Sequence, residues 1–102
     1  MIIKKNQSKE KLVLTLEGRL DTTTAPQLEA EISLIEQDVQ LLELDFHQLE
    51  YLSSAGLRVI LTAQKKLVSP RRMVIKGVNE TIMEVFEITG FADILTIEKG
   101  DC

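Results

Sequence analysis

Apolar and polar residues alternate near the start of the chain. Over residues 11–17, leucine occupies every second position, and lysine, valine, threonine and glutamate occupy the positions between. A period of two predicts a strand with one packed face. Ile2–Lys4 predicts a short partner strand, joined to it through a polar turn over residues 6–9. Gly18 interrupts the alternation, and we expect the strand to end there.

Three later segments place apolar residues at helical spacing. The first starts at Thr24–Gln27, whose Thr-x-x-Gln spacing predicts a capping box with a proline in the first turn. The second runs from about Ser53 to Leu67 and stops before Pro70. The third is predicted to start at a cap on Asn79 and to end at Gly90, a C′ residue.

Further strands are predicted between these helices. Val39–Phe46 is mostly apolar, which is typical of a central strand, and a polar connection follows it. Met73–Ile75 is a short buried strand closed by Gly77, and Ile94–Ile97 is the last strand. Strands and helices that alternate with short connections indicate a mostly parallel sheet with right-handed crossovers. We therefore predict one α/β domain over residues 1–102, a mixed, mostly parallel sheet of four to five strands with three to four helices.

Composition narrows the possible functions. The chain has 102 residues, a formal net charge of −4, and 44% hydrophobic and 27% charged residues. An acidic chain without a basic face argues against direct nucleic-acid binding. No apolar stretch approaches the ~20 residues of a membrane span, and the start of the chain does not have the pattern of a secretion signal. One histidine and one cysteine, Cys102, provide no metal-ligand spacing and no internal disulfide. We expect a cytoplasmic protein without metal or cofactor.

Two serines at the start of the second predicted helix are the main candidates for chemistry. Ser53 stands at the N-cap position, which leaves Ser54 in the exposed first turn. Free N–H groups and the helix dipole favour a phosphate at such a position. Ser54 is therefore a candidate phosphoacceptor, with Ser53 as its rival. An ordinary surface serine in a first turn is the simpler interpretation.

Three sequence blocks, in order, resemble the STAS domain family, which is named for sulfate transporters and anti-sigma factor antagonists. The family's central pattern is an apolar strand ending in Asp, an aromatic and an apolar residue, Asp-Ser-Ser/Thr-Gly-Leu, and an apolar helix. Ser53 stands where many members carry Asp, and Ala55 where they carry Ser or Thr. The residues that match the three blocks are Asp45, Tyr51, Leu52, Ser54, Gly56 and Leu57; the segment Gly18–Ala25, with Leu20, Asp21 and Thr24; and Thr89, Gly90 and Phe91.

This resemblance implies an anti-sigma factor antagonist of a bacterial partner-switching system, and not an enzyme. The unphosphorylated protein would bind an anti-sigma factor that is also a serine kinase of the histidine-kinase-like ATPase class. The kinase would phosphorylate Ser54, and a metal-dependent serine phosphatase would reverse the modification. The partner-binding residues that follow are Asp21, Thr24, Asp45, Ser53, Ser54, Ala55, Gly56 and Arg58.

Several of these residues also have simpler interpretations. Asp21 and Thr24 suit a cap for the first helix, and Asp45 suits a turn at the end of its strand. Gly56 costs ~1 kcal/mol relative to alanine in a helix. That cost indicates close approach by a partner or by a neighbouring element.

Two alternative functions remain open. One is a STAS docking subunit of another assembly, such as an accessory protein of phospholipid transport. The other is a small hydrolase in which Ser54 is the nucleophile and His47 the base, oriented by Asp45 or Asp21. The chain has no Gly-x-Ser-x-Gly elbow and no oxyanion-hole motif, which argues against the hydrolase.

Overall fold

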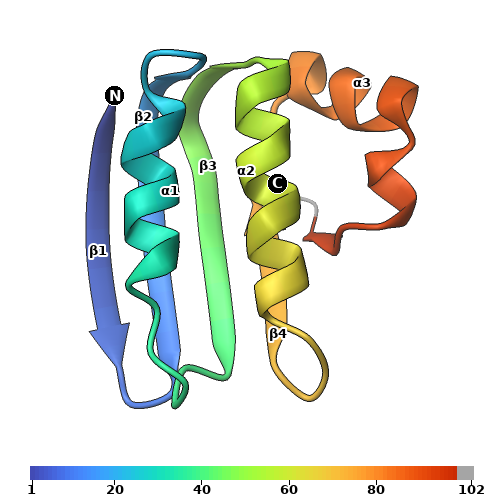
Figure 1. The fold of residues 1–102 in the computed structure, drawn as a ribbon. Coiled ribbons are helices and arrows are strands. Elements are labelled where there is room, and N and C mark those ends of the chain that lie inside the picture. Colours follow the sequence, from blue (N-terminus) through green and yellow to red (C-terminus); the bar gives the residue numbers. More distant parts are fainter. Residues whose placement is uncertain (99–102) are drawn as a thin grey trace.

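Five strands form one mixed sheet in the order β1-β2-β3-β4-β5 in the computed structural model, which describes residues 1–98 (Figure 1). Only β1 is antiparallel to its neighbour, and the other pairs are parallel. This confirms the predicted mixed, mostly parallel sheet. Cys102 lies outside the described residues. The strands are β1 (Ile2–Ser8), β2 (Lys11–Leu20), β3 (Leu41–Leu52), β4 (Arg72–Lys76) and β5 (Ile97–Glu98).

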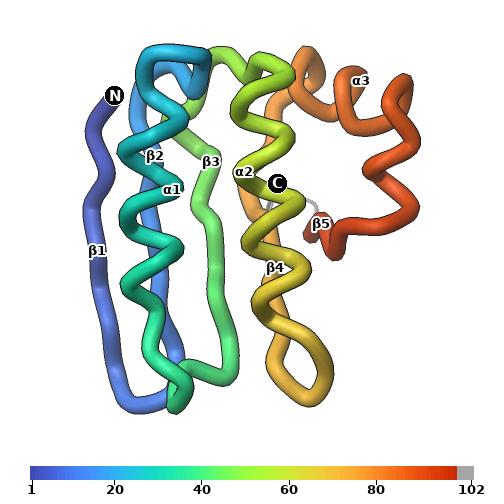
Figure 2. The backbone as a smooth tube through the Cα atoms, in the orientation of Figure 1, coloured from blue at the N-terminus to red at the C-terminus, as the bar shows by residue number. Residues whose placement is uncertain are grey.

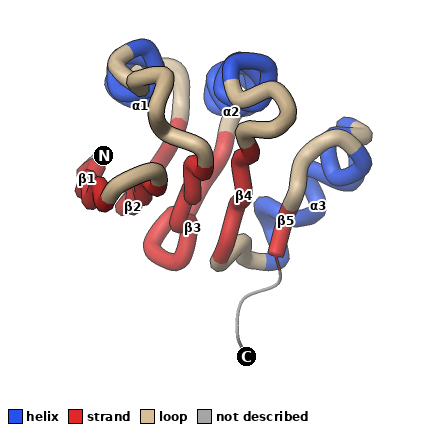
Figure 3. Tube along the Cα trace, turned by 90° about the horizontal axis from the view of Figure 1, so that it is seen from below, coloured by secondary structure: helices blue, strands red, loops and turns tan. Residues whose placement is uncertain are grey.

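Helices α1 (Ala25–Ser33) and α2 (Ser54–Lys66) lie side by side on one face of the sheet (Figure 3). Helix α3 (Glu80–Thr89) and a single 3-10 turn (Phe91–Asp93) lie near the β5 edge. The core fills the space between the sheet and α1 and α2, and Ile82 and Phe86 of α3 join it. The alternate leucines of β2 are all buried there, as the period of two predicts. Leu42, Leu44 and Phe46 of β3 are buried in the same way.

The opposite face of β1–β4 carries mostly polar side chains. The Glu43 carboxylate of β3 lies 3.4 Å from the Lys11 ammonium on β2 and 3.2 Å from the Lys76 ammonium on β4. Lys76 also approaches Glu98 on β5 at 3.6 Å. Hydrogen bonding and the charge of Glu43 raise the pKa of Lys76 above its ordinary value. A sheet face that contacts water needs this composition, so the sequence of β3 is less apolar than a doubly covered central strand.

The two central strands are longer than the sequence predicts. β2 passes through Gly18 to Leu20, and β3 starts at Leu41 and continues through the predicted polar connection to Leu52. Two irregularities in their pairing, before Glu17 and before Arg19, accommodate extra residues of β3 and its bend (Figure 2). Gly18 adopts a φ of +105° at one of them. The polar residues stay in the strand because their side chains point toward water while the backbone groups pair.

The end of the chain also differs from the prediction. The last strand is the two-residue β5, not Ile94–Ile97, because residues 91–95 form the 3-10 turn and its continuation. The carbonyl of Phe91 accepts from the N–H groups of Ile94 and Leu95 there. The predicted ends of α3 are confirmed, since Asn79 Oδ1 accepts from the N–H of Ile82 at 2.8 Å and Gly90 has a φ of 83°.

Candidate partner-binding surface

The serine turn joins the end of β3 to the start of α2. The N–H of Ser53 donates to the carbonyl of Leu20 at 2.9 Å, which ties this turn to the end of β2. The Ser53 Oγ accepts from the N–H of Gly56 at 3.4 Å, so Ser53 is the predicted N-cap. Ser54 is exposed, and its hydroxyl has no hydrogen-bond partner among residues 1–98. The turn therefore presents one free hydroxyl at the positive end of a helix.

The neighbouring turn, between β2 and α1, is held by the side chain of Asp21. One carboxylate oxygen, Oδ1, accepts from the N–H of Thr23 at 3.0 Å, the Thr23 hydroxyl at 2.8 Å and the N–H of Thr24 at 3.2 Å. These hydrogen bonds, above all the one from the Thr23 hydroxyl, hold the pKa of Asp21 below its ordinary value of 3.8 and outweigh the opposing effect of desolvation. Asp21 is thus an acceptor that organises its own loop.

The capping box predicted at Thr24–Gln27 does not form. The Thr24 hydroxyl donates to the carbonyl of Arg19 at 2.8 Å and accepts from the N–H of Asp21 at 2.8 Å. Its backbone is already helical, with φ of −102° and ψ of −19°, so its side chain does not reach the free N–H groups of the first helical turn. The Asp21 side chain takes over this role, because its Oδ1 accepts from the N–H groups of Thr23 and Thr24, while its carbonyl accepts from the N–H of Ala25 at 2.8 Å.

A groove of about 250 Å³ lies between α1 and α2, and its lining includes Thr22 of the first turn and Ala55, which follows Ser54. Its wall on α1 is made by small and acidic residues, and its wall on α2 includes Ala55 and Arg58. Arg58 is exposed and makes no ion pair among residues 1–98. The structure therefore brings Asp21, Thr24, Ser53, Ser54, Ala55 and Arg58 to one end of the molecule, at the carboxyl ends of β2 and β3.

Gly56 is explained by internal packing. A Cβ atom at this position would lie 2.7 Å from Leu20 Cγ and 2.7 Å from Leu52 Cδ1. These two leucines are the last residues of β2 and β3, so α2 starts directly against the strand ends. Of the two explanations offered by the sequence, the neighbouring element is the correct one.

Asp45 does not lie at a strand end, as the sequence suggested, but within β3. It pairs with Thr15, whereas Ser53 binds Leu20, so the two levels are separated by five residues of strand. At 3.3 Å per residue, this is about 16 Å along the sheet. The structure therefore separates Asp45 from the serine turn.

His47 lies beside Asp45 and away from the serines. Its ring Nδ1 is 2.6 Å from Asp45 Oδ1, and its backbone N–H donates to the same oxygen at 3.0 Å. The His47 ring packs on Gly77. Burial raises the pKa of Asp45, but the hydrogen bonds from His47 and the charges of His47 and Lys76 outweigh it and lower the pKa below 3.8. The nucleophile and the base of a catalytic triad must lie within hydrogen-bond reach of each other. Because His47 lies with Asp45, away from the serine turn, no triad with Ser54 is assembled.

Arg19 and Tyr51 lie near the two turns, at the carboxyl ends of β2 and β3, and the sequence does not predict their contact. The Arg19 guanidinium lies 4.2 Å from the centre of the Tyr51 ring and 3.8 Å from Asp21 Oδ2. The sequence shows only that each residue follows an alternating strand. Their contact depends on the register of β2 against β3, which places them opposite one another.

Residues 1–98 contain neither a cluster of metal ligands nor a membrane-spanning helix. No group of three or more acidic, histidine or cysteine side chains is arranged to hold a metal there. Within the same residues, no helix is both long and apolar enough to cross a bilayer.

Comparison with known proteins agrees with this architecture. The STAS domain family model matches residues 2–100, so the chain belongs to the STAS domain family. It is 36% identical to BtrV of Bordetella bronchiseptica, a candidate anti-sigma factor antagonist by name, over 87% of this chain and 78% of BtrV. It is 31% identical to an anti-sigma-B factor antagonist of Staphylococcus aureus, over 81% of this chain and 79% of that protein.

The fold is also that of a solved anti-sigma factor antagonist. SpoIIAA in its unphosphorylated form superposes with a TM-score of 0.76 and 22% identity, covering 99% of this chain and 89% of SpoIIAA. SpoIIAA of Bacillus in its phosphorylated form gives a TM-score of 0.74 at the same identity, covering 95% of this chain and 91% of that one.

Proposed function

We propose that this protein is an anti-sigma factor antagonist whose binding to an anti-sigma factor is switched off by phosphorylation of Ser54. The observation that carries the proposal is the free, exposed Ser54 hydroxyl beside the groove between α1 and α2. The names of the relatives in Bordetella and Staphylococcus support the general role. A solved protein of this fold is known in phosphorylated and unphosphorylated forms.

The contact surface in this proposal is the set of residues that the two turns bring together. Asp21 and Thr24 shape one turn, Ser53 caps α2, and Ala55 and Arg58 extend the surface along the groove. Gly56 contributes indirectly, because it lets α2 approach the strand ends. Asp45 lies too far along β3 to join this surface, and we assign its carboxylate to the contact with His47.

Phosphate at Ser54 would act on the interface and leave the fold intact. It adds about −1.5 to −2 charges and three acceptor oxygens. At the start of a helix these charges meet a favourable dipole. A partner that covers Ser54 must instead desolvate them, and this cost opens the complex. In our proposal the anti-sigma factor is itself the ATP-dependent serine kinase, of the histidine-kinase-like class, and a metal-dependent phosphatase restores binding, all in the cytoplasm.

Capture from native cells tests this function. The wild type, Ser54→Ala and Ser54→Asp would each be used as bait, followed by mass spectrometry and mapping of phosphorylated peptides. We expect a small ATPase-type kinase with the wild type and with Ser54→Ala. Its affinity for Ser54→Asp should be at least tenfold lower, about 1.4 kcal/mol.

The matched control is Ser53→Ala, because it removes the neighbouring hydroxyl. This variant should keep both the partner and the phosphate on Ser54. Phosphate found mainly on Ser53 would overturn the assignment of the site. Capture of transporter subunits in place of a kinase would instead support a docking subunit of another assembly.

A further inference from the structure

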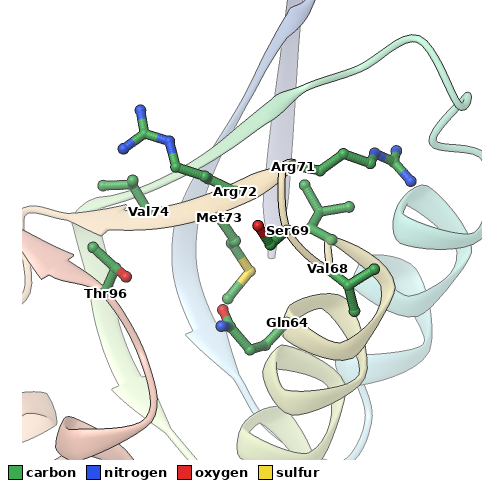
Figure 4. A pocket seen from close by; sticks show the side chains of 9 residues that line it. Gln64, Val68, Ser69, Arg71, Arg72, Met73, Val74 and Thr96 are labelled. Carbon is green, nitrogen blue, oxygen red and sulfur yellow. The ribbon is translucent and has the colours of Figure 1, made fainter.

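The C-terminal half of α2 borders a second groove, at the opposite end of that helix from Ser54. Its volume is about 320 Å³, and it lies between α2, β4 and the residue before β5 (Figure 4). Leu67, Met73 and Val74 make its apolar wall, and all three are buried. Gln64 and Thr96 add polar atoms at its sides. None of these residues belongs to the surface proposed for the anti-sigma factor.

The groove follows the edge of β4. Within residues 1–98, β5 pairs only with Ile75 and Lys76, so residues 72–74 of β4 have a strand neighbour on the β3 side alone. Met73 pairs with the buried Leu42 and points toward α2, whereas Arg72 and Val74 alternate to the other face. Side chains from both faces line the same groove, and this arrangement is possible only where the groove runs along the strand edge.

One polar atom in this groove is left without a partner. The Oε1 of Gln64 is buried and accepts no hydrogen bond within the described part of the chain. The side chains of Gln64 and Met73 extend toward one another across the groove (Figure 4). Buried acceptors in folded proteins are nearly always paired, either with protein groups or with ordered water, so this oxygen is an acceptor for a donor that enters the groove.

The charge around the groove selects the kind of partner. Within residues 1–98 no carboxylate lines it, whereas two arginines do, in a chain with a net charge of −4. The Arg71 guanidinium turns away from the groove and donates to the carbonyls of Val39 at 2.8 Å and Glu36 at 3.0 Å, so Arg72 supplies the charge that an occupant meets (Figure 4). Arg72 is exposed and has no ion-pair partner among residues 1–98. An acidic group is the complementary occupant.

We propose that this groove binds an extended acidic peptide segment of a partner protein, which adds a short strand to the edge of β4. Strand addition supplies main-chain hydrogen bonds, and alternate side chains supply specificity. The guest residue beside Met73 faces Gln64 and carries a hydroxyl donor, as threonine does. Its neighbour on the other face carries a carboxylate that meets Arg72. Because the uncovered part of this β4 edge spans three residues, 72–74, within the described part of the chain, the contact is short and weak.

Titration of the ¹⁵N-labelled full chain, followed by NMR, tests the proposal. The probe is the peptide acetyl-Gly-Glu-Thr-Val-Glu-Gly-amide, and the control replaces both glutamates with lysine. At about 1 mM peptide and physiological salt, where distant charges are screened, we expect saturable shifts of the Gln64 carboxamide and of the Met73 and Thr96 amides. Arg72→Glu should weaken binding at least fivefold. Lys65→Glu makes the same charge change on an exposed residue outside the groove, and should change it less than twofold.

A second comparison isolates the unpaired oxygen. Replacing threonine with valine in the probe should weaken its binding to the wild type at least threefold, but should not weaken binding to Gln64→Leu. A purely structural Gln64 would give equal losses in the two proteins.

Three other outcomes would overturn the proposal. These are shifts confined to residues away from the β4 edge or absent altogether, equal binding of the lysine peptide, and shifts at this edge that depend on the concentration of the protein alone. The last would mean that a second copy of this chain occupies the groove.

Discussion

The two turns that follow β2 and β3 do the same structural task by different means. Each joins a parallel strand to a helix at the same end of the sheet. The Asp21 turn is held by hydrogen bonds, with one carboxylate oxygen serving Thr23 and Thr24. The Ser53 turn rests on packing and on one backbone hydrogen bond to Leu20, because Gly56 lets α2 press on Leu20 and Leu52, whereas the hydrogen bond to the Ser53 side chain is 3.4 Å long.

This difference determines which turn is available for chemistry. The polar groups of the first turn are used within it, and changing them would change its shape. The second turn depends on an apolar contact beneath it, so the Ser54 hydroxyl above remains free. A modification at Ser54 can therefore alter the surface without dismantling the turn. Variants that remove one kind of support at a time test this contrast.

The largest effect is expected at the packed contact. Gly56→Ala places a methyl group 2.7 Å from two buried leucines, and overpacking of this kind typically costs 1–3 kcal/mol. The better helix propensity of alanine returns only ~1 kcal/mol. We expect the free energy of unfolding, measured with urea, to fall by up to about 2 kcal/mol, the overpacking cost less the gain in helix propensity. Ser54→Ala, in the same helical turn, is the control and should stay within about 0.5 kcal/mol of wild type. A more stable Gly56→Ala would contradict the packing argument.

The hydrogen-bonded turn should be the next most sensitive. Asp21→Ala removes the acceptor of several hydrogen bonds and leaves the Thr23 and Thr24 donors to water. We expect the Tm to fall by about 4–8 °C, which is the shift expected when a domain of this size loses the net contribution of one hydrogen bond. Asp21→Asn keeps an oxygen at the same place and should lose less. Equal losses would show that the negative charge, and not the acceptor geometry, holds the turn.

The pKa of Asp21 gives this contribution a defined pH dependence. A carboxylate whose pKa is lower in the folded protein stabilises it above the unfolded value of 3.8, and this contribution is lost as the pH falls through the lower, folded pKa. The difference in Tm between wild type and Asp21→Asn should be constant near neutral pH and shrink below pH 3.8. Thermal melts in a pH series measure it. A difference in Tm that grows on acidification would mean that folding raises the pKa of Asp21, and it would contradict this account.

A smaller effect is expected from the helix cap of the serine turn. Ser53→Ala removes a long hydrogen bond, so its cost should lie near the lower end of the range for N-caps, about 0.5–1 kcal/mol. Asn79→Ala is the matched comparison, because that cap accepts at 2.8 Å and its amide also donates to the carbonyl of Leu49. It should cost more, about 1–2 kcal/mol by urea unfolding. The opposite order would show that Ser53 has a further structural contact.

The smallest change in stability is expected at Ser54 itself. Ser54→Asp places one negative charge in the first turn of α2, where the dipole stabilises it by ~0.3–1 kcal/mol. Its Tm should equal or slightly exceed that of wild type, even though partner binding is weakened. A clear fall in Tm would mean that the switch acts by unfolding the start of α2.

Local patterns in the sequence predict much of this fold. The alternate leucines of β2 identify its buried face, and Ser53, Asn79 and Gly90 identify helix ends that the structure confirms. Each of these signals lies within a few residues of the feature that it predicts. The matched STAS blocks, in their order along the chain, led to the correct family.

Most errors arose where a distant segment decides the outcome. Gly18 looks like a strand end, but pairing with β3 carries β2 past it to Leu20. The error at Thr24 is local instead: it looks like a cap, but Asp21 and Arg19, three and five residues earlier, engage its hydroxyl. Asp45 looks like a strand end because β3 turns polar there, yet that polarity reflects an uncovered sheet face.

The sequence by itself therefore determined the α/β class, the order of elements and the serine-headed helix, because hydrophobic period and capping act over short distances. Only the tertiary structure decided why position 56 is glycine, since Leu20 and Leu52 meet it from two strands. It also decided that Asp45 joins His47 and not Ser54. Strand register fixes the first result, and the continuation of β3 past Asp45, which pairing with β2 sustains, separates Asp45 from Ser54. Both depend on contacts between residues that are far apart in the chain.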